Sequence, residues 1–264
     1  MNVDSLIHGD CLEVMKDIPD KSIDMILCDL PYGTTSSKWD SIIPFDKLWQ
    51  EYTRIIKNNR VICLFGAEPF SSALRMSNPT WFKYDWVWIK NNGVGYFNAN
   101  LKPLNKHEII SVFSNGKTAN GNKNNMLYNP QGLIHCGKFI EKHGNKKGKD
   151  GTYWRPSNKK SYIRELTNYP TTVLNFAKDP KPVHPTQKPI ALCEYLIKTY
   201  SNEGDVVLDN CCGSGTTAVA CINTNRKYVC IEKTEHYFEI AKNRIETAKQ
   251  QVKLPLGDED ATCR

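Results

Sequence analysis

Apolar residues along the chain fall into short runs separated by segments with helical spacing. Runs of strand length predict β-strands at residues 5–8, 23–28, 60–65, 205–209 and 227–232. Apolar positions three or four residues apart predict helices at residues 11–18, 45–56, 189–200, 216–223 and 236–249. Two further apolar runs, 81–90 and 108–114, predict a pair of antiparallel strands. Because strands alternate with helices, we predict an α/β fold: a Rossmann-like, mostly parallel sheet with helices on both faces and an antiparallel hairpin at its edge.

Positive charge is concentrated in one segment of the chain. The 264 residues carry a formal net charge of +7, but residues 115–164 hold eleven Lys and Arg against two acidic residues, so this segment alone is net +9. Aromatic residues are interleaved with the basic ones: Tyr128, Tyr153, Trp154 and Tyr162. Basic groups contact phosphates and aromatic groups stack on bases, so the segment is typical of nucleic-acid binding. The alternative is a solvated insertion whose charge only aids solubility.

The cysteines and the apolar runs limit the class of protein. The ten cysteines form no Cys-x-x-Cys pair, and Cys211 and Cys212 are adjacent, so we predict neither a metal site nor a disulfide framework. Free cysteines in turn predict a reducing compartment. No apolar run approaches the roughly 20 residues that span a bilayer, and the first residues do not resemble a signal peptide. With a mean hydropathy of −0.51, the sequence predicts a cytoplasmic protein.

A glycine-rich turn follows the predicted strand 205–209. Gly213 and Gly215 precede a predicted helix, whose first N–H groups can bind a carboxylate or phosphate. Glu232 ends the next strand, about 20 residues later, where an acid can accept hydrogen bonds from ribose hydroxyls. Asp209, just before the glycines, would repel a pyrophosphate but suits an ammonium group. A nucleoside that carries a zwitterionic amino acid therefore fits better than NAD, and S-adenosylmethionine is that molecule.

A second motif follows the predicted strand 23–28 and consists of Asp29, Leu30, Pro31 and Tyr32. It places a carboxylate, a proline-stiffened turn and an aromatic ring at the carboxyl end of a strand, where ligands bind in open α/β sheets. Alone, such a tetrapeptide is more simply a strand-to-loop turn. In the same chain as the glycine-rich turn, it predicts a catalytic site.

Together the two motifs resemble those of the amino-methylating DNA methyltransferases, whose catalytic motif is Asp-Pro-Pro-Tyr. The catalytic motif precedes the cofactor motif, which is similar to the β group of that family and its circularly permuted topology. Further segments that resemble family motifs are residues 8–13 with 19–24, residues 184–189, and residues 231–232 with 237–242. The resemblance covers most of the chain. It implies a site-specific, S-adenosylmethionine-dependent DNA (adenine-N6)-methyltransferase, encoded by a bacterium or a phage, with the basic segment as its target-recognition insertion.

The resemblance also assigns roles to single residues. The catalytic residues are Asp29, Leu30, Pro31 and Tyr32, with Leu30 in place of the usual Pro. The residues assigned to the cofactor are Asp10, Thr186, Lys188, Asp209, Cys211, Gly213, Gly215, Thr216, Thr217 and Glu232. Among these, Asp10 is implied near the adenine, and Thr186 and Lys188 near the methionine end. Cys211 and Cys212 replace an aromatic and a small residue that the family usually has beside the adenosine.

The mechanism follows from the target amine, whose lone pair is delocalised into the base. Asp29 and the carbonyl of Leu30 would each accept one N–H of the amine, which localises the lone pair for attack on a methyl group. The base must first be flipped out of the duplex, with Tyr32 stacking on it. No metal ion is needed for this chemistry.

The DNA contacts are predicted in the basic segment and in the loop after the catalytic motif. The residues predicted to bind DNA are Trp39, Lys146, Lys147, Lys149, Arg155, Lys159 and Lys160. The predicted domain organisation is a catalytic half (1–114), a target-recognition insertion (115–180), a cofactor-binding half (181–253) and a flexible tail (254–264). The predicted partner is double-stranded DNA. A cognate restriction endonuclease and a homodimer are further partners that the resemblance allows, and no membrane is involved.

Four alternatives remain open from the sequence. The nearest is N4-cytosine methylation by the same machinery, although that motif more often starts with Ser than with Asp. Methylation of a protein glutamine or an RNA base is a second, and those motifs more often start with Asn. A third is a catalytically inactive DNA-binding protein on a methyltransferase fold. The fourth is an NAD-dependent dehydrogenase, which would need a third glycine where Thr217 and Ala218 stand.

Overall fold

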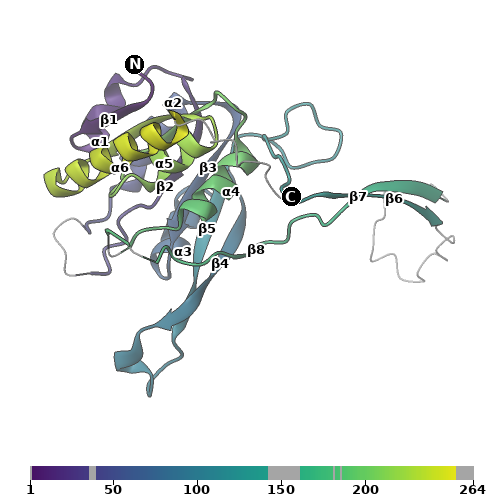
Figure 1. Ribbon diagram of the computed structural model, residues 1–264, viewed down its shortest axis with the longest axis horizontal. Coiled ribbons are helices and arrows are strands. Elements are labelled where there is room, and N and C mark those ends of the chain that lie inside the picture. Colours follow the sequence, from purple (N-terminus) through teal and green to yellow (C-terminus); the bar gives the residue numbers. More distant parts are fainter. Residues whose placement is uncertain (1, 36–39, 142–160, 181, 185, 254–264) are drawn as a thin grey trace, which may run out of the picture. The chain divides into compact units, whose positions relative to one another are not determined.

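The computed structural model describes residues 2–35, 40–141, 161–180, 182–184 and 186–253, and Figure 1 shows their arrangement. The chain forms two compact units: Met1–Asn129 with Thr172–Arg264, and the shorter segment Pro130–Thr171. The first unit holds an eight-stranded sheet with helices packed against it. The second unit holds a separate two-stranded sheet.

The eight-stranded sheet has the strand order β1-β10-β9-β2-β3-β5-β4-β8. Its strands are β1 (Ser5–His8), β2 (Ile23–Cys28), β3 (Ile56–Gly66), β4 (Phe82–Val94), β5 (Asn105–Phe113), β8 (Val173–Asn175), β9 (Val206–Asp209) and β10 (Lys227–Glu232). From β1 to β3 all neighbours are parallel, whereas β5 is antiparallel to both β3 and β4. The short edge strand β8 is parallel to β4. The predicted α/β fold, mostly parallel with an antiparallel hairpin, is confirmed.

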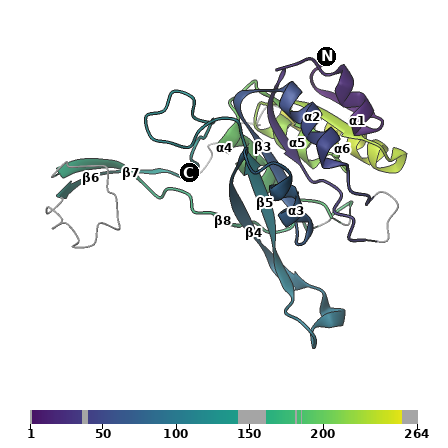
Figure 2. The ribbon, with the colours of Figure 1, turned by 180° about the vertical axis from the view of Figure 1, so that it is seen from behind.

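Helices cover both faces of this sheet. They are α1 (Cys11–Val14), α2 (Phe45–Ile55), α3 (Phe70–Ser77), α4 (Ile190–Tyr200), α5 (Thr216–Asn223) and α6 (Glu235–Lys253), with short 3-10 helices η1 (Met15–Asp17) and η2 (Tyr96–Asn98). α4, α5 and α6 lie on one face (Figure 1), and α1, α2 and α3 lie on the other (Figure 2). Met25 and Leu27 of β2 pack in one core and Ile26 and Cys28 in the other, because successive side chains of a strand point to opposite faces.

Several elements differ from the predicted ones. β3 begins at Ile56, directly after α2, whereas the sequence predicts a strand only from residue 60, because the polar residues Lys57, Asn58 and Asn59 interrupt the apolar run. α3 is not predicted, since three of its eight residues are serines. β8 has three residues, two of them exposed, which is too short for a pattern to reveal.

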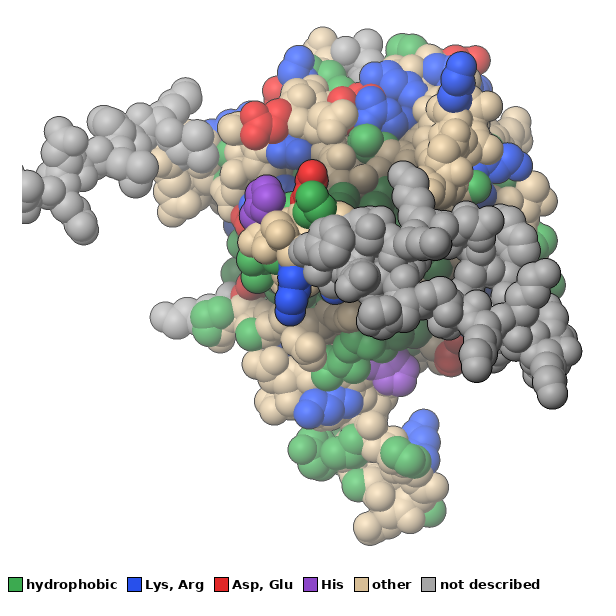
Figure 3. Space-filling model, turned by 90° about the vertical axis from the view of Figure 1, so that its right-hand side faces the viewer, with side chains coloured by type: hydrophobic (Ala, Val, Ile, Leu, Met, Phe, Trp, Pro, Cys, Tyr) green, Lys and Arg blue, Asp and Glu red, His purple; other side chains and the backbone are tan. Residues whose placement is uncertain are grey.

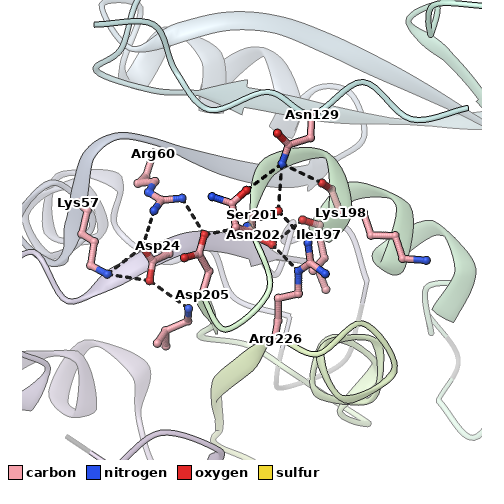
Figure 4. A network of polar contacts seen from close by, with 11 residues as sticks. Asp24, Lys57, Arg60, Asn129, Ile197, Lys198, Ser201, Asn202, Asp205 and Arg226 are labelled. Atoms are coloured by element: carbon pink, nitrogen blue, oxygen red, sulfur yellow. Dashed lines mark hydrogen bonds and ion pairs between the residues drawn. The ribbon is translucent and has the colours of Figure 1, made fainter. Parts of the chain in front are cut away.

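Charged side chains tie together the amino ends of β2, β3 and β9 (Figure 4). Asp24 of β2 has a buried carboxylate, and Lys57 donates to both of its oxygens at 2.8 Å. Arg60 of β3 pairs with Asp24 at 3.0 Å and with Asp205, just before β9, at 2.7 Å. Two cations therefore compensate the buried Asp24, and they fix three neighbouring strands at one edge of the sheet.

Residues 115–129 also pack on this part of the first unit. The backbone N–H of Asn129 donates to the carbonyl of Thr199 at 2.7 Å. Its side-chain amide donates to the carbonyl of Ser201 at 3.2 Å (Figure 4). Met126 is buried in the core. The separate unit therefore begins at Pro130 and ends at Thr171, within the predicted insertion 115–180 and shorter than it.

The second unit is built on a hairpin of β6 (Ile134–Glu141) and β7 (Ser161–Thr167), which pair antiparallel with an irregularity between His135 and Lys138. The sequence does not predict this hairpin, because basic and polar residues interrupt its apolar positions. The predicted DNA-binding residues Trp39, Lys146, Lys147, Lys149, Arg155, Lys159 and Lys160 lie outside the described residues, as does the predicted tail 254–264. No helix in the described part of the chain has both the length and the apolar character needed to cross a membrane.

Candidate active site

The carboxyl ends of β1, β10, β9 and β2 meet at the edge of the sheet opposite the network of Figure 4. A cavity of about 740 Å³ lies there, within the range of small-molecule sites. From β2 the chain continues to β3 on one side, and from β9 it continues to β10 on the other. Such a switch point is where open α/β sheets bind ligands. The cavity wall includes every predicted catalytic residue and every predicted cofactor residue except Gly215.

Asp209 ends β9, and its buried carboxylate braces the glycine-rich turn. Oδ1 accepts the backbone N–H of Cys211 at 3.1 Å, and Oδ2 accepts the hydroxyl of Thr217 at 2.6 Å. Burial raises the pKa of Asp209 to about 7. A cation bound in the cavity would favour the ionised form, so this wall suits a positively charged ligand group.

Glu232 ends β10 and connects the same turn to the next loop. One carboxylate oxygen accepts the N–H of Gly213 at 2.9 Å, and the other accepts the N–H of Thr234 at 2.7 Å. Each oxygen keeps a second acceptor site, so Glu232 can still bind hydroxyl groups of a ligand. Gly213 has φ +52°, a backbone conformation that glycine adopts without strain.

Asp10 and Cys211 add an acidic and a neutral group to the cavity wall. Asp10 caps α1 by accepting the N–H of Leu12 at 3.0 Å, and its bond from Lys233 lowers the pKa of this carboxyl. The pKa of the Cys211 thiol is raised by hydrogen bonds with neighbouring thiols and by burial, so the sulfur stays protonated and uncharged.

Gly215 does not line the cavity, contrary to the prediction. It caps the start of α5 with φ +77°, and a Cβ at this position would lie 3.0 Å from the Cβ of Ala241 in α6. Gly215 therefore permits a tight turn and the close packing of two helices. The neighbouring Thr216 lines the cavity.

Asp29 follows β2, and both of its oxygens are engaged by cavity residues. The Tyr32 hydroxyl donates to Oδ1 at 2.6 Å, and the Lys188 ammonium donates to Oδ2 at 2.5 Å. Burial raises the pKa of Asp29, and the charge of Lys188 opposes this shift. Burial alone would lower the pKa of Lys188, but Asp29 and Glu108 outweigh it and raise that pKa. Lys188, predicted near the cofactor, thus directly contacts the carboxylate that the sequence predicts to be catalytic.

Glu108 and Lys90 extend this contact into a chain of four charges. Lys188 pairs with Glu108 at 3.2 Å, and Lys90 pairs with the other oxygen of Glu108 at 2.6 Å. Burial would raise the pKa of Glu108, yet the two lysines hold it below its usual value. All four side chains are largely buried and their charges sum to zero. The sequence does not reveal Glu108 or Lys90 as site residues. They reach the cavity because β4 and β5 pair with Trp88 opposite Glu108, and this pairing is not visible in the sequence.

The loop after the catalytic motif is organised by Asp40. Its carboxylate accepts the backbone N–H groups of Gly33, Thr34 and Thr35 at 2.8, 2.9 and 2.6 Å. Burial would raise the pKa of Asp40, but these hydrogen bonds lower it. Tyr32, at the start of the loop, stacks on Phe70 with ring centroids 5.0 Å apart. The Asp40 carboxylate thus fixes the backbone conformation of the loop that follows Asp29 and Tyr32.

His184 and Thr186 come from the segment before α4. The backbone N–H of Thr186 donates to Nδ1 of His184 at 3.2 Å, and the imidazole lies against the Tyr237 ring with centroids 4.2 Å apart. Burial and the charge of Lys188 lower the pKa of His184 to about 4, so the ring is neutral near pH 7. Both residues line the cavity. No three His, Cys, Asp or Glu side chains among the described residues are grouped so as to hold a metal ion.

Comparison with known protein families matches residues 23–243 to the N6/N4 methyltransferase family, described as DNA methylase. The chain belongs to this family. It is 28% identical over 277 aligned positions to the type II methyltransferase M.HinfI of Haemophilus influenzae, which covers 94% of this chain and 69% of that protein.

The fold of this methylase matches solved structures along nearly its whole length. A crystal structure of an M1.HpyAVI–SAM complex aligns with a TM-score of 0.60 and 24% identity, covering 91% of this chain and 98% of that one. The cytosine-N4-specific PvuII DNA methyltransferase aligns with a TM-score of 0.65 and 14% identity, covering 95% and 91%. The predicted fold and the predicted activity of a DNA methyltransferase are confirmed. The choice between adenine and cytosine stays a prediction.

Proposed function

We propose that this methylase acts on the N6 amino group of adenine in double-stranded DNA. The observation that carries the proposal is the placement of Asp29: a carboxylate in the cavity wall, held by Tyr32 and Lys188 and followed by Leu30 and Pro31. A catalytic motif that starts with Asp resembles the adenine enzymes more than the cytosine ones. The motif order also supports membership of the β group, since Asp29 precedes the glycine-rich turn in the chain.

The cavity fits S-adenosylmethionine, the methyl donor. Asp209 faces the cavity from a buried position where a cation favours its ionised form, which suits the amino group of a methionine moiety. Glu232 and Asp10 supply acceptors for hydroxyl and amino groups, and Thr216 and Thr217 add hydroxyls at the start of α5. Gly213 brings the backbone close to this space without a side chain. When bound, S-adenosylmethionine supplies an electrophilic sulfonium methyl group.

Residues of this chain activate the amine. Asp29 and the backbone carbonyl of Leu30 each accept one N–H of the flipped base, which draws the nitrogen toward tetrahedral geometry and localises its lone pair. As the nitrogen becomes positively charged, the nearby Asp29 carboxylate stabilises it. Lys188 favours the ionised form of Asp29, because its ammonium opposes the rise in pKa that burial causes. Tyr32 orients the carboxylate through its hydroxyl and offers a ring beside the base.

Target choice is proposed to lie in the basic segment. Its net charge of +9 supports phosphate contacts, and its aromatic and amide side chains support contacts to bases. The second unit, Pro130–Thr171, forms most of this segment and is separate from the core that holds the cavity. A cognate endonuclease, dimer formation and a cytoplasmic location stay predictions.

Nucleoside mass spectrometry tests the proposed base. DNA from cells that lack other methyltransferases is digested after expression of the wild-type protein, and N6-methyladenine is expected. N4-methylcytosine instead would overturn the adenine assignment, and the absence of both would overturn the assignment of the site.

Asp29→Ala provides the matched control for this experiment and tests the catalytic role. The variant is expected to lose at least about 100-fold in the rate of methyl transfer, the effect typical of removing one preorganised electrostatic group. Its cofactor affinity in calorimetry should stay close to that of the wild type, because Asp29 acts on the amine. Transfer of tritiated methyl groups to DNA at a near wild-type rate would contradict this mechanism.

A further inference from the structure

The end of the β4–β5 hairpin exposes large apolar side chains. β4 ends at Val94 and β5 begins at Asn105, and residues 91–106, here called the hairpin end, contain η2. Tyr96 is 70% exposed, Phe97 is fully exposed and Leu101 is 83% exposed. Figures 1 and 2 show the hairpin extending away from the helices of the first unit. Apolar groups of this size gain free energy when they are covered, so their clustering marks a contact surface.

The charge of the hairpin end is complementary to DNA. It contains Lys102 and Lys106 and no acidic residue. Its amide side chains, which can bond the edges of bases, are Asn91, Asn92, Asn98, Asn100 and Asn105. Both lysines are exposed. In Figure 3 the projecting end at the foot of the molecule displays hydrophobic and basic side chains on the visible face.

The backbone of the hairpin end is shaped by close packing. A Cβ at Gly93 would lie 2.8 Å from the Cβ of Leu104, so only a glycine lets the two sides of the hairpin approach this closely. Gly95 then turns the chain with φ +99° directly before Tyr96. The packed pair Gly93 and Leu104 therefore supports the exposed aromatic residues on a defined turn.

The two strands lead from this surface into the cavity. Lys90 precedes the hairpin end and Glu108 follows shortly after it, and both line the cavity beside Trp88. Trp88 and Glu108 are opposite one another in the β4–β5 ladder. A duplex whose flipped base enters the cavity would thus pass close to the two strands that connect to Tyr96 and Phe97.

We propose that the hairpin end binds the DNA duplex next to the flipped base. Tyr96 and Phe97 stack on the bases that the flipped nucleotide leaves behind, and Lys102 and Lys106 contact phosphates. The inference rests on the DNA methyltransferase activity and extends it to a surface outside the cavity and outside the basic segment. A second copy of the chain is a less suitable partner for this surface. A symmetric contact would bring the lysines of the two copies together, and their like charges would repel.

The double variant Tyr96→Ser with Phe97→Ser tests the proposal. The substrate is unmethylated kilobase DNA made by amplification, which contains many copies of any short recognition sequence. We expect the KM for DNA to rise at least about fivefold, the minimum effect of losing one stacked aromatic side chain. Cofactor affinity in calorimetry should be unchanged, because neither residue lines the cavity. Met76→Ser is the matched control, since it removes another side chain that is 73% exposed, on α3.

Lys102→Ala with Lys106→Ala gives an independent measurement. On a short duplex, the slope of log affinity against log salt concentration should become shallower by roughly 1.8, since each phosphate contact contributes about 0.9. An unchanged KM in the aromatic variant, or an unchanged slope in the lysine variant, would overturn the proposal. So would a loss of self-association in sedimentation with DNA affinity intact, which would assign the surface to a second copy. Discovery of N4-methylcytosine as the product would overturn only the adenine assignment, because these comparisons do not depend on the base.

Discussion

At the scale of single residues, the site depends on a neutral chain of buried charges. Asp29, Lys188, Glu108 and Lys90 are each paired with the next, at 2.5, 3.2 and 2.6 Å. Removing one partner from a buried ion pair leaves an uncompensated charge, which is far more costly than losing an exposed pair. The protonation state of Asp29 is therefore set by residues that are distant from it in the sequence.

Lys188→Met should shift the pH dependence of methyl transfer. Burial already raises the pKa of Asp29, and removing the cation that opposes this effect raises it further. In the proposed mechanism the ionised Asp29 accepts an N–H of the amine, so activity is expected to be lost as the pH falls through the pKa of Asp29. We expect the acidic limb of the kcat profile to move to higher pH, with cofactor affinity in calorimetry little changed.

Lys90→Met serves as the control, because Lys90 contacts Glu108 and not Asp29. It should shift the acidic limb less than Lys188→Met does, and Lys188→Arg should restore most of the wild-type profile. Equal profiles for Lys188→Met and the wild type would show that Lys188 does not control the ionisation of Asp29.

Glu232→Ala should weaken binding of S-adenosylmethionine by ~1–3 kcal/mol, the effect of leaving hydrogen-bonding groups without their partner. In this structure the change also frees the N–H groups of Gly213 and Thr234. Calorimetry measures the difference, with the exposed Glu239→Ala of α6 as the control. Unchanged affinity would remove Glu232 from the cofactor site.

At the scale of elements, the strands and helices that enclose the cavity follow from the apolar pattern. β2, β9 and β10 lie where apolar runs predict them, and α2 and α4 lie within a residue of their predicted ends. The three strands are buried on both faces, so most of their residues are apolar and the runs are easy to recognise. The pattern predicts the residues at the carboxyl edge for the same reason, because Asp29, Asp209 and Glu232 each end or follow such a strand.

What the pattern does not predict depends on contacts between distant segments. Glu108 is a largely buried residue in the polar first half of β5, and only its neighbours show that it belongs to the site. Lys188 contacts Asp29, 159 positions away, through the folded arrangement of β2 and the segment before α4. Position 215 needs a glycine because Ala241 of α6 packs closely against it. A local motif cannot indicate this contact with a distant helix.

Gly215→Ala tests the packing of α5 against α6. The substitution places a side chain in a left-handed backbone conformation and against Ala241, so the free energy of unfolding should fall by about 1–3 kcal/mol. Gly204→Ala is the control, because Gly204 has φ +81° and no atom within 4 Å of its Cβ position. Urea denaturation of both variants separates the effect of backbone conformation from that of packing. Equal losses would show that the contact with Ala241 is readily relieved.

At the scale of the whole molecule, charge and chemistry are carried by different parts of the chain. Residues 115–164 are net +9, so the remaining residues, which supply the cavity, are net −2. The cavity-bearing part therefore does not attract DNA through its net charge, and the long-range part of the electrostatic attraction must come mainly from the basic segment.

Replacing Lys146, Lys147 and Lys149 by Ala should therefore make the salt dependence of DNA binding shallower. If all three contact phosphates, the slope of log affinity against log salt concentration falls by roughly 2.7. The control variant replaces three exposed lysines elsewhere in the chain, Lys16, Lys47 and Lys198. A slope equal to that of the wild type in the first variant would place recognition outside this lysine cluster.

The strand order also determines when the enzyme can form during its synthesis. Ser5 of β1 lies opposite Val229 of β10, and Met25 of β2 lies opposite Val207 of β9. β1 therefore leaves the ribosome long before its partner β10 is synthesised, and such distant pairing slows folding. Until then Asp29 faces no cofactor cavity and the apolar faces of β1 and β2 stay uncovered. A nascent chain of this methylase is therefore inactive and vulnerable to aggregation until β10 has been synthesised.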